Sequence, residues 1–134
     1  MIDWYKKVVF ENFANFSGRA RRSEFWYFVL VNCIISTVFT ISSLSIFDTN
    51  ASLASMISLI SGLYSLAIFI PNLAVTVRRL HDVGKSGWYY FIVLIPLLGV
   101  ILLLYWFCQE GELNENKWGH NPKDNYSDID EIGA

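Results

Sequence analysis

The stretch "FWYFVLVNCIISTVFTISSLSIF", from Phe25 to Phe47, contains no charged side chain. A helix rises about 1.5 Å per residue, so a helix of this length can cross a bilayer core of about 30 Å. A secretory signal has an apolar core of only about 7 to 15 residues, and here a second apolar run follows closely. The stretch therefore predicts a transmembrane helix that stays in the mature protein.

Two further uncharged runs follow the first. They are "SLASMISLISGLYSLAIFIPNLAVTV" at 52–77 and "WYYFIVLIPLLGVILLLYWFC" at 88–108. Of the 134 residues, 54% are hydrophobic and only 16% are charged, a balance that is unusual for a small soluble domain. We therefore predict one all-α integral membrane domain over 1–134, with transmembrane helices at 25–47, 52–77 and 88–108.

The third run also allows a re-entrant hairpin that turns between Pro96 and Gly99. Such a hairpin would return the carboxyl-terminal tail to the side from which the run started. Its two arms would be short, and the backbone polar groups of its turn would need burial in protein. We favour a continuous helix over 88–108, which would place the tail on the outer side.

The positions of the cations predict the orientation in the membrane, because Lys and Arg favour the cytoplasmic side. The connection at 48–51 has no cation. The cations near the first run are Lys6, Lys7, Arg19, Arg21 and Arg22, and those between the second and third runs are Arg78, Arg79 and Lys85. We therefore predict a multi-pass protein of the bacterial inner (plasma) membrane with a cytoplasmic amino terminus.

The two ends of the chain differ in character. Residues 1–17 carry apolar side chains at spacings of three and four, namely Ile2, Tyr5, Val9, Phe13 and Phe16. This pattern predicts an amphipathic helix that either lies in the headgroup layer or packs on the protein's own spans. Residues 109–134 are polar and acidic and cannot bury enough apolar surface to fold alone, so we expect a flexible tail.

Charged residues gather in two similar segments, "GRARRSEFW" at 18–26 and "RRLHDVGKSGW" at 78–88. Cations at helix ends anchor a helix in the headgroup layer. The acids among them also predict an ion-pair lattice around a gap of phosphate size, because an Arg fork binds phosphate or carboxylate at two points. The predicted lipid- or partner-binding cluster is Arg19, Arg21, Arg22, Glu24, Arg78, Arg79, Asp82 and Lys85. The predicted interfacial anchors are Trp4, Trp26, Trp88, Tyr89 and Tyr90.

The second segment, at 78–88, does not have the pattern of a nucleotide-binding loop or of a catalytic site. The "GKS" at 84–86 is not the end of a P-loop, because Arg79 stands where the first glycine would be needed. Adjacent residues on a helix point apart, so His81 and Asp82 do not form a catalytic or metal-binding pair. We expect no enzymatic activity, no catalytic residue, no metal and no cofactor.

Four motifs in this order resemble the domain-of-unknown-function 805 (DUF805) family of YhaH-like small bacterial inner-membrane proteins. They are "GRARRSEFW" at 18–26, "RRLHDVGKSGW" at 78–88, "IPLLG" at 95–99 and "NKWGHNP" at 116–122. The resemblance covers nearly the whole chain. It implies an inner-membrane protein with no settled biochemical activity.

These observations lead to one functional hypothesis and one alternative. The hypothesis is a non-enzymatic inner-membrane protein that binds anionic lipid headgroups, a membrane-protein partner or a second copy through its cytoplasmic Arg-rich rim. The alternative is a subunit of an oligomeric small transporter or channel, in which Ser, Thr and Asn72 would line a polar path. No nucleic-acid partner is expected.

Overall fold

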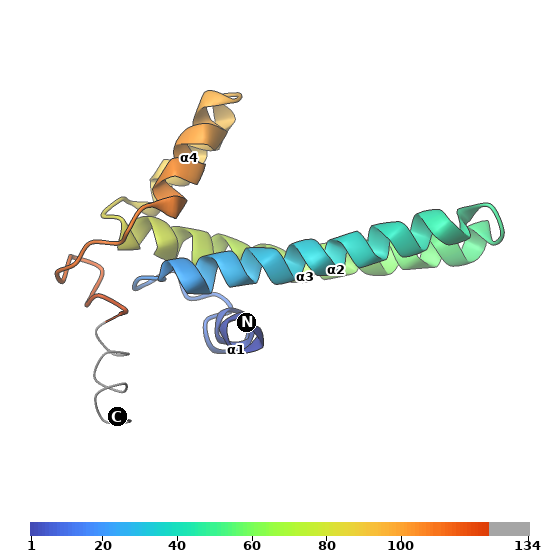
Figure 1. Ribbon diagram of the computed structural model, residues 1–134, viewed down its shortest axis with the longest axis horizontal. Helices are drawn as coiled ribbons and strands as arrows, with labels where there is room; N and C mark the ends of the chain where they lie inside the picture. The colour runs from blue at the N-terminus through green and yellow to red at the C-terminus, as the bar shows by residue number, and fades with distance from the viewer. Residues whose placement is uncertain (124–134) are drawn as a thin grey trace.

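The computed structural model describes residues 1–123, whose regular secondary structure is helical apart from one isolated bridge between Asn116 and Gly119. The all-α prediction is confirmed for these residues. In chain order the elements are α1 (Ile2–Lys6), the π-helical η1 (Lys7–Glu11), α2 (Arg22–Phe47), α3 (Ala51–Asp82), the 3-10 helix η2 (Gly87–Leu94) and α4 (Leu98–Cys108) (Figure 1). The acidic end of the predicted flexible tail, 124–134, lies outside the described residues.

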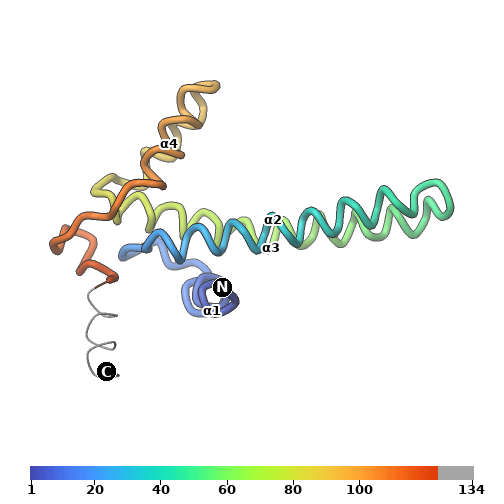
Figure 2. The backbone as a smooth tube through the Cα atoms, viewed as in Figure 1, coloured from blue at the N-terminus to red at the C-terminus, as the bar shows by residue number. Residues whose placement is uncertain are grey.

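The helices α2 and α3 form a long hairpin that runs away from the rest of the chain (Figure 2). The side chain of Asn50 caps α3 by accepting from the Leu53 amide at 3.0 Å, and the Ser43 and Ser58 hydroxyls join the helices at 2.9 Å. Most side chains along the hairpin face outward, and Leu66, for example, is 72% exposed. Both helices are long and apolar enough to cross a membrane.

The third predicted span is not a single helix, so the continuous helix expected over 88–108 is wrong and the three-span arrangement is not confirmed. The segment turns at Ile95–Leu97, with η2 as one arm and α4 as the other. Proline cannot donate a backbone hydrogen bond, and it holds the preceding residue in an extended conformation. Ile95 is extended at φ −82° and ψ 110°, and Leu97 has a positive φ of 62°.

Local hydrogen bonds reduce the backbone cost that made the hairpin unattractive from sequence. The Ile95 amide donates to the Ile92 carbonyl at 3.0 Å, and the Gly99 amide donates to the Ile95 carbonyl at 3.1 Å. A Cβ atom at position 99 would lie 1.8 Å from the Ile92 carbonyl oxygen. Glycine is therefore needed for α4 to pack against η2, and the motif "IPLLG" specifies the hairpin.

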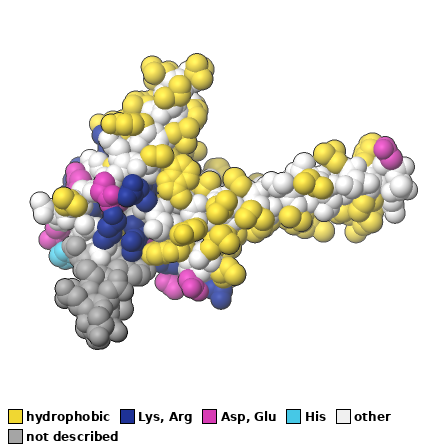
Figure 3. Space-filling model, in the orientation of Figure 1, with side chains coloured by type: hydrophobic (Ala, Val, Ile, Leu, Met, Phe, Trp, Pro, Cys, Tyr) yellow, Lys and Arg dark blue, Asp and Glu magenta, His cyan; other side chains and the backbone are white. Residues whose placement is uncertain are grey.

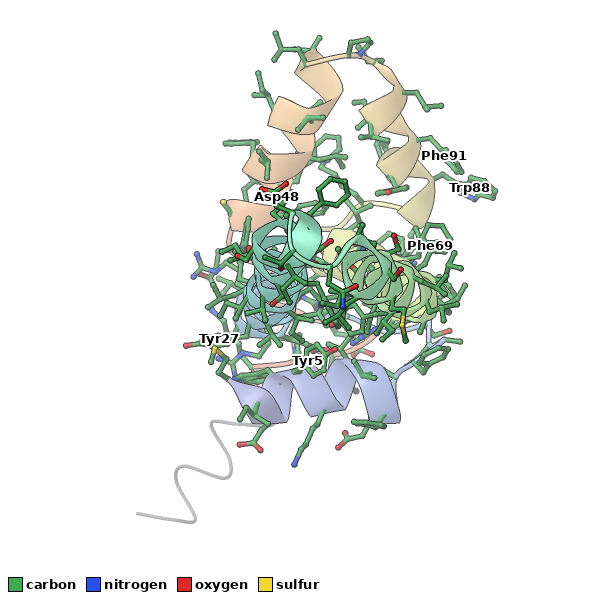
Figure 4. All side chains as sticks on the ribbon, turned by 90° about the vertical axis from the view of Figure 1, so that its right-hand side faces the viewer. Tyr5, Tyr27, Asp48, Phe69, Trp88 and Phe91 are labelled. Carbon is green, nitrogen blue, oxygen red and sulfur yellow. The ribbon has the colours of Figure 1, made fainter. Side chains whose placement is uncertain are left out.

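The other elements meet one end of the α2 and α3 pair from two sides. Viewed along the pair, α1 lies across it on one side, and the η2 and α4 hairpin projects from the other (Figure 4). The helical amino-terminal segment ends at Glu11, so Phe13 and Phe16 lie beyond the helix predicted over 1–17. The amino-terminal segment packs on α2 and α3 through buried Val8 and through a 2.9 Å hydrogen bond between the Tyr5 and Tyr64 hydroxyls.

The hydrophobic core lies at this same end, where the elements meet. Its buried members are Val8, Ala20, Phe25, Phe28, Val75, Leu80, Leu103, Trp106 and Phe107. The rest of the α2 and α3 hairpin has almost no such core. The molecule therefore consists of a packed end, from which one long apolar hairpin and one short apolar hairpin project.

Candidate functional site

The end of α3 carries the charged residues beyond the apolar run 52–77. The helix closes with a paired turn, in which the Lys85 amide donates to the Leu80 carbonyl at 2.8 Å and the Gly84 amide donates to His81 at 3.1 Å. Gly84 has φ +79°, the left-handed conformation that this type of helix end requires. The closed end turns the chain towards η2 and leaves residues 78–82 facing the segment before α2.

That segment, residues 18–21, runs beside the end of α3 and is tied to it by the backbone. The Ala20 amide donates to the Arg78 carbonyl at 3.0 Å. The Nδ1 atom of His81 lies 3.0 Å from the Gly18 carbonyl oxygen, so this nitrogen carries the proton. The two charged segments predicted from sequence are thus in direct contact.

The first ion-pair group centres on Glu24, whose side chain is completely buried. One carboxylate oxygen accepts from Arg78 Nη1, and the other lies 3.5 Å from Lys7 Nζ. The group therefore joins η1, α2 and α3. Lys7 was not part of the cluster predicted from sequence.

The second group centres on Asp82, which bonds two arginines. Arg19 Nε donates to one carboxylate oxygen at 3.0 Å, and Arg79 Nη1 donates to the other. Arg79 is completely buried and also donates to the carbonyl oxygen of Phe107 at 3.1 Å. This guanidinium connects the end of α3 to the end of α4.

Residues 109–123 cover the second group, so the prediction that this part of the tail lies on the opposite side from the arginines is wrong. The Glu112 amide donates to the Asp82 carbonyl at 2.7 Å, and Arg19 Nη1 donates to the Asn114 carbonyl at 2.9 Å. A Cβ atom at Gly111 would lie 2.2 Å from Asp82 Oδ2. Only glycine lets the chain pass this close.

The two ion-pair groups together form the ion-pair network, and the remaining predicted residues lie at its edge. Arg22 pairs with Glu110 at 2.5 Å, and both side chains are more than 40% exposed. Lys85 Nζ lies 4.7 Å from the centre of the Trp106 ring, and the Arg21 guanidinium lies 5.4 Å from the centre of the Trp4 ring. These contacts place the three cations around the network rather than within it.

The predicted aromatic anchors also surround the packed end, with differing exposure. Trp26 is half-buried and donates from Nε1 to the Phe107 carbonyl at 3.2 Å. Trp88 is 78% exposed and projects outward from η2 with Phe91 (Figure 4). Tyr89 is exposed, whereas Tyr90 and Trp4 are half-buried.

The sequence that forms this arrangement is similar to known proteins. Residues 13–120 match the model of a family described as "Protein of unknown function (DUF805)". The chain belongs to this family. It is 38% identical over 122 residues to "Inner membrane protein YhaI" of Escherichia coli K12, which covers 91% of this chain and 97% of that protein. It is also 38% identical over 122 residues to "Inner membrane protein YhaH" of the same strain, with 91% and 98% covered. No solved structure matches.

The family match has a structural counterpart in this DUF805 protein. Both ion-pair groups lie within 13–120 except for Lys7, which precedes the matched segment. The tail motif "NKWGHNP" supplies Trp118, whose ring stacks on His81 with centroids 4.5 Å apart. From sequence, this motif was identified as a family feature, but the favoured continuous helix placed it on the opposite side from the arginines. The binding role of the predicted charged cluster stays a prediction.

The electrostatic balance of the network favours the neutral form of His81. Burial lowers the pKa of its imidazole below the usual value, the Gly18 carbonyl opposes this shift, and the charge of Lys117 adds to it. For the buried ion pairs, desolvation offsets much of the Coulombic attraction, but removal of one partner costs about 3 to 5 kcal/mol. We therefore expect the network to hold the packed end in one arrangement.

Proposed function

We propose that this DUF805 protein is a non-enzymatic inner-membrane protein that crosses the membrane with α2 and α3 and binds anionic phospholipid headgroups at its packed end. The distribution of charge supports a cytoplasmic position for that end. The turn at 48–50 has no cation, whereas the cations of the described residues belong to the packed end and its surroundings. Lys and Arg favour the cytoplasmic side.

The short hairpin supports a position at the membrane surface. It projects across the direction of α2 and α3 (Figure 1), and its outer residues are strongly exposed, with Trp88 at 78%, Leu94 at 75% and Leu97 at 76%. In the proposed arrangement these side chains lie among the lipids of the cytoplasmic leaflet. The amino-terminal helix lies across α2 and α3 as well, as interfacial helices do.

A groove beside α2 carries the proposal of lipid binding. It has a volume of about 520 Å³ and is lined by Arg22, Ser23, Trp26, Tyr27, Leu30 and Cys108. Arg22 and Ser23 lie in the first turn of α2, which has no side-chain cap, so the positive end of the helix dipole adds to the guanidinium charge. The headgroup would bind at this turn, and an acyl chain would follow Trp26 and Leu30 towards the bilayer.

Two observations support the availability of this groove. The pair between Arg22 and Glu110 is exposed, and exposed pairs contribute only about 0 to 1 kcal/mol, so an anion can replace the carboxylate. Lys and Arg side chains gather next to apolar surface at this end of the molecule (Figure 3). A phospholipid requires this juxtaposition of charge and apolar surface.

The alternative of a transporter subunit has less support. Ser43 and Ser58, which the sequence offered for a polar path, bond to each other between α2 and α3. Their hydroxyls serve helix packing within one chain, as small polar residues commonly do in membranes. The buried acids likewise pair with arginines, an arrangement that favours a structural over an acid-base role.

The test measures retention of phosphatidylglycerol by native mass spectrometry of the full-length protein in lipid nanodiscs. Arg22→Gln should weaken retention about fivefold, because one juxtamembrane cation contributes about 1 kcal/mol towards anionic headgroups. Lys117→Gln is the matched control, because Lys117 is an exposed cation of the tail that lies outside both the groove and the predicted cluster, and it should have little effect. Glu110→Gln should strengthen retention because it frees Arg22. Equal retention by all three variants would refute lipid binding at the groove.

A further inference from the structure

A second cavity lies beside the ion-pair network, between the segment before α2, the end of α3 and the tail. Its volume is about 360 Å³. The side chains that matter here are three cations, Lys7, Arg19 and Arg78, and the rings of Trp118 and His120. Among residues 1–123, no Asp or Glu lines it. It shares no lining residue with the groove beside α2.

Arg78 is the residue that points to a ligand. Its side chain is only 3% exposed, and its Nη1 atom donates to Glu24. Its Nε and Nη2 atoms are also buried and have no hydrogen-bond partner within the described part of the chain. Buried polar groups are almost always hydrogen-bonded, and an unpaired charged donor is especially costly. A guanidinium with two such donors is suited to an acceptor that arrives from outside the chain.

The charge balance indicates that this acceptor is an anion. Three buried guanidiniums, those of Arg19, Arg78 and Arg79, share two buried carboxylates, those of Glu24 and Asp82. The carbonyls of Asn114 and Gln109 in the tail, which accept from Arg19 and Arg79, supply dipoles but no charge. A negative ligand at the cavity would complete the compensation that buried charges require.

We propose that this cavity binds a phosphate group carried by a small organic molecule or by a lipid headgroup. Arginine recognises phosphate oxygens through its planar fork, and a lysine adds a point charge. The cavity is larger than one phosphate ion, and the rings of Trp118 and His120 offer a surface for the organic part. The inference goes beyond the proposed function, because it concerns a separate cavity and a phosphate group from either source.

Binding is measured by isothermal titration calorimetry on the full-length protein in detergent. The two probes are glycerol 3-phosphate and dihexanoyl phosphatidic acid, which carry the same phosphomonoester without and with acyl chains. The key variant is Lys7→Gln, and its matched control is Lys6→Gln, whose exposed side chain does not line the cavity. Lys7→Gln should weaken binding about fivefold, whereas Lys6→Gln should leave it within about twofold.

A second variant removes the central guanidinium without leaving a buried charge behind. The double substitution Glu24→Gln with Arg78→Gln should abolish binding, while circular dichroism confirms that the helices remain. Binding of both probes, or of only one, supports the phosphate site and identifies the source of the ligand. No measurable heat with either probe, or equal weakening by Lys6→Gln and Lys7→Gln, would overturn it.

The two binding proposals fail independently. Arg22→Gln should leave glycerol 3-phosphate binding unchanged, because Arg22 does not line this cavity. Lys7→Gln should likewise leave phosphatidylglycerol retention at the groove unchanged. If Arg22→Gln weakens both phosphatidylglycerol retention and glycerol 3-phosphate binding, and Lys7→Gln weakens neither, both ligands bind at the groove and the cavity proposal is wrong.

Discussion

The imidazole of His81 lies parallel to the indole of Trp118, with ring centroids 4.5 Å apart and an interplanar angle of 6°. The contact joins the last turn of α3 to the tail, and the Asn116 side chain reinforces it by donating to the His81 carbonyl at 2.9 Å. It therefore fixes the tail on the side of the molecule that carries the arginines.

Loss of this stack should release the tail. In Trp118→Ala, amides within 109–119 should exchange with deuterium faster than in the wild type, because Trp118 is the large ring that holds this segment to α3. Trp88→Ala is the control. Trp88 is exposed on the short hairpin, so its removal should leave the exchange of the tail amides unchanged. Unchanged exchange in Trp118→Ala would show that the backbone bonds to Arg19 and Asp82 hold the tail alone.

Cysteine labelling tests on which side of the membrane the tail lies. In a Cys33→Ala, Cys108→Ala background, Glu115→Cys in intact cells should resist a membrane-impermeant thiol reagent and react only after lysis. Thr49→Cys, in the turn between α2 and α3, should react in intact cells. The opposite pattern would invert the proposed orientation, and labelling of both positions in intact cells would contradict the observed hairpin.

The buried pair between Arg79 and Asp82 should be strongly destabilised when one partner is removed. Arg79→Gln should lower the free energy of unfolding by about 3 to 5 kcal/mol, because Asp82 then stays buried with only Arg19 as partner. Adding Asp82→Asn should restore part of this loss. Chemical denaturation in detergent measures both variants, and the exposed Glu110→Gln should change stability by less than about 1 kcal/mol. A loss of that small size in Arg79→Gln would show that the network contributes little.

Two glycines, Gly62 within α3 and Gly99 in the first turn of α4, should respond in opposite ways to alanine. Gly99→Ala should disrupt the short hairpin, because the new Cβ would overlap the Ile92 carbonyl. Gly62→Ala meets no atom within 4 Å and should stabilise α3 by up to about 1 kcal/mol through helix propensity. Thermal unfolding followed by circular dichroism compares the pair. Equal midpoints would argue against close packing of η2 on α4.

Acidification should weaken the packed end through His81. Its pKa is lowered by burial in the folded protein, whereas the unfolded value is about 6.5. Its contribution to stability is therefore complete above about pH 6.5 and is lost as the pH falls towards the folded pKa. The unfolding midpoint of the wild type should fall more steeply below that pH than that of His81→Gln. His120→Gln, at an exposed position, should follow the wild type, and parallel curves for His81→Gln would contradict the mechanism.

The sequence predicted the helical class and the two long apolar helices because uninterrupted apolar runs leave few other structures. It offered the short hairpin only as the less favoured alternative, because the arms are short and the backbone polar groups of the turn would need burial in protein. Two local features favour the turn: the Ile95 and Gly99 amides bond to nearby carbonyls, and the lack of a side chain at Gly99 leaves room for the Ile92 carbonyl. Neither fact is visible in hydropathy.

Most charged residues of the candidate site were predicted from sequence, but their contacts with the amino-terminal helix and the tail were not. The acids Glu24 and Asp82 indicated ion pairs with the nearby arginines, which the structure contains. Lys7 and Gly111 were missed, because their roles depend on how the amino-terminal helix and the tail cross the end of α3. Such crossings arise from tertiary packing and leave no clear pattern in the sequence around Lys7 or Gly111.

The packed end also gives the molecule two unequal halves. Beyond it, α2 and α3 continue alone to the turn at 48–50, whereas at the packed end the amino-terminal helix and the short hairpin lie to either side of them (Figure 4). In a bilayer crossed by α2 and α3, the protein would displace much more lipid from one leaflet than from the other. Where many copies gather, the leaflet that holds the packed ends would occupy the larger area. The membrane there would curve so that this leaflet lies on the convex side.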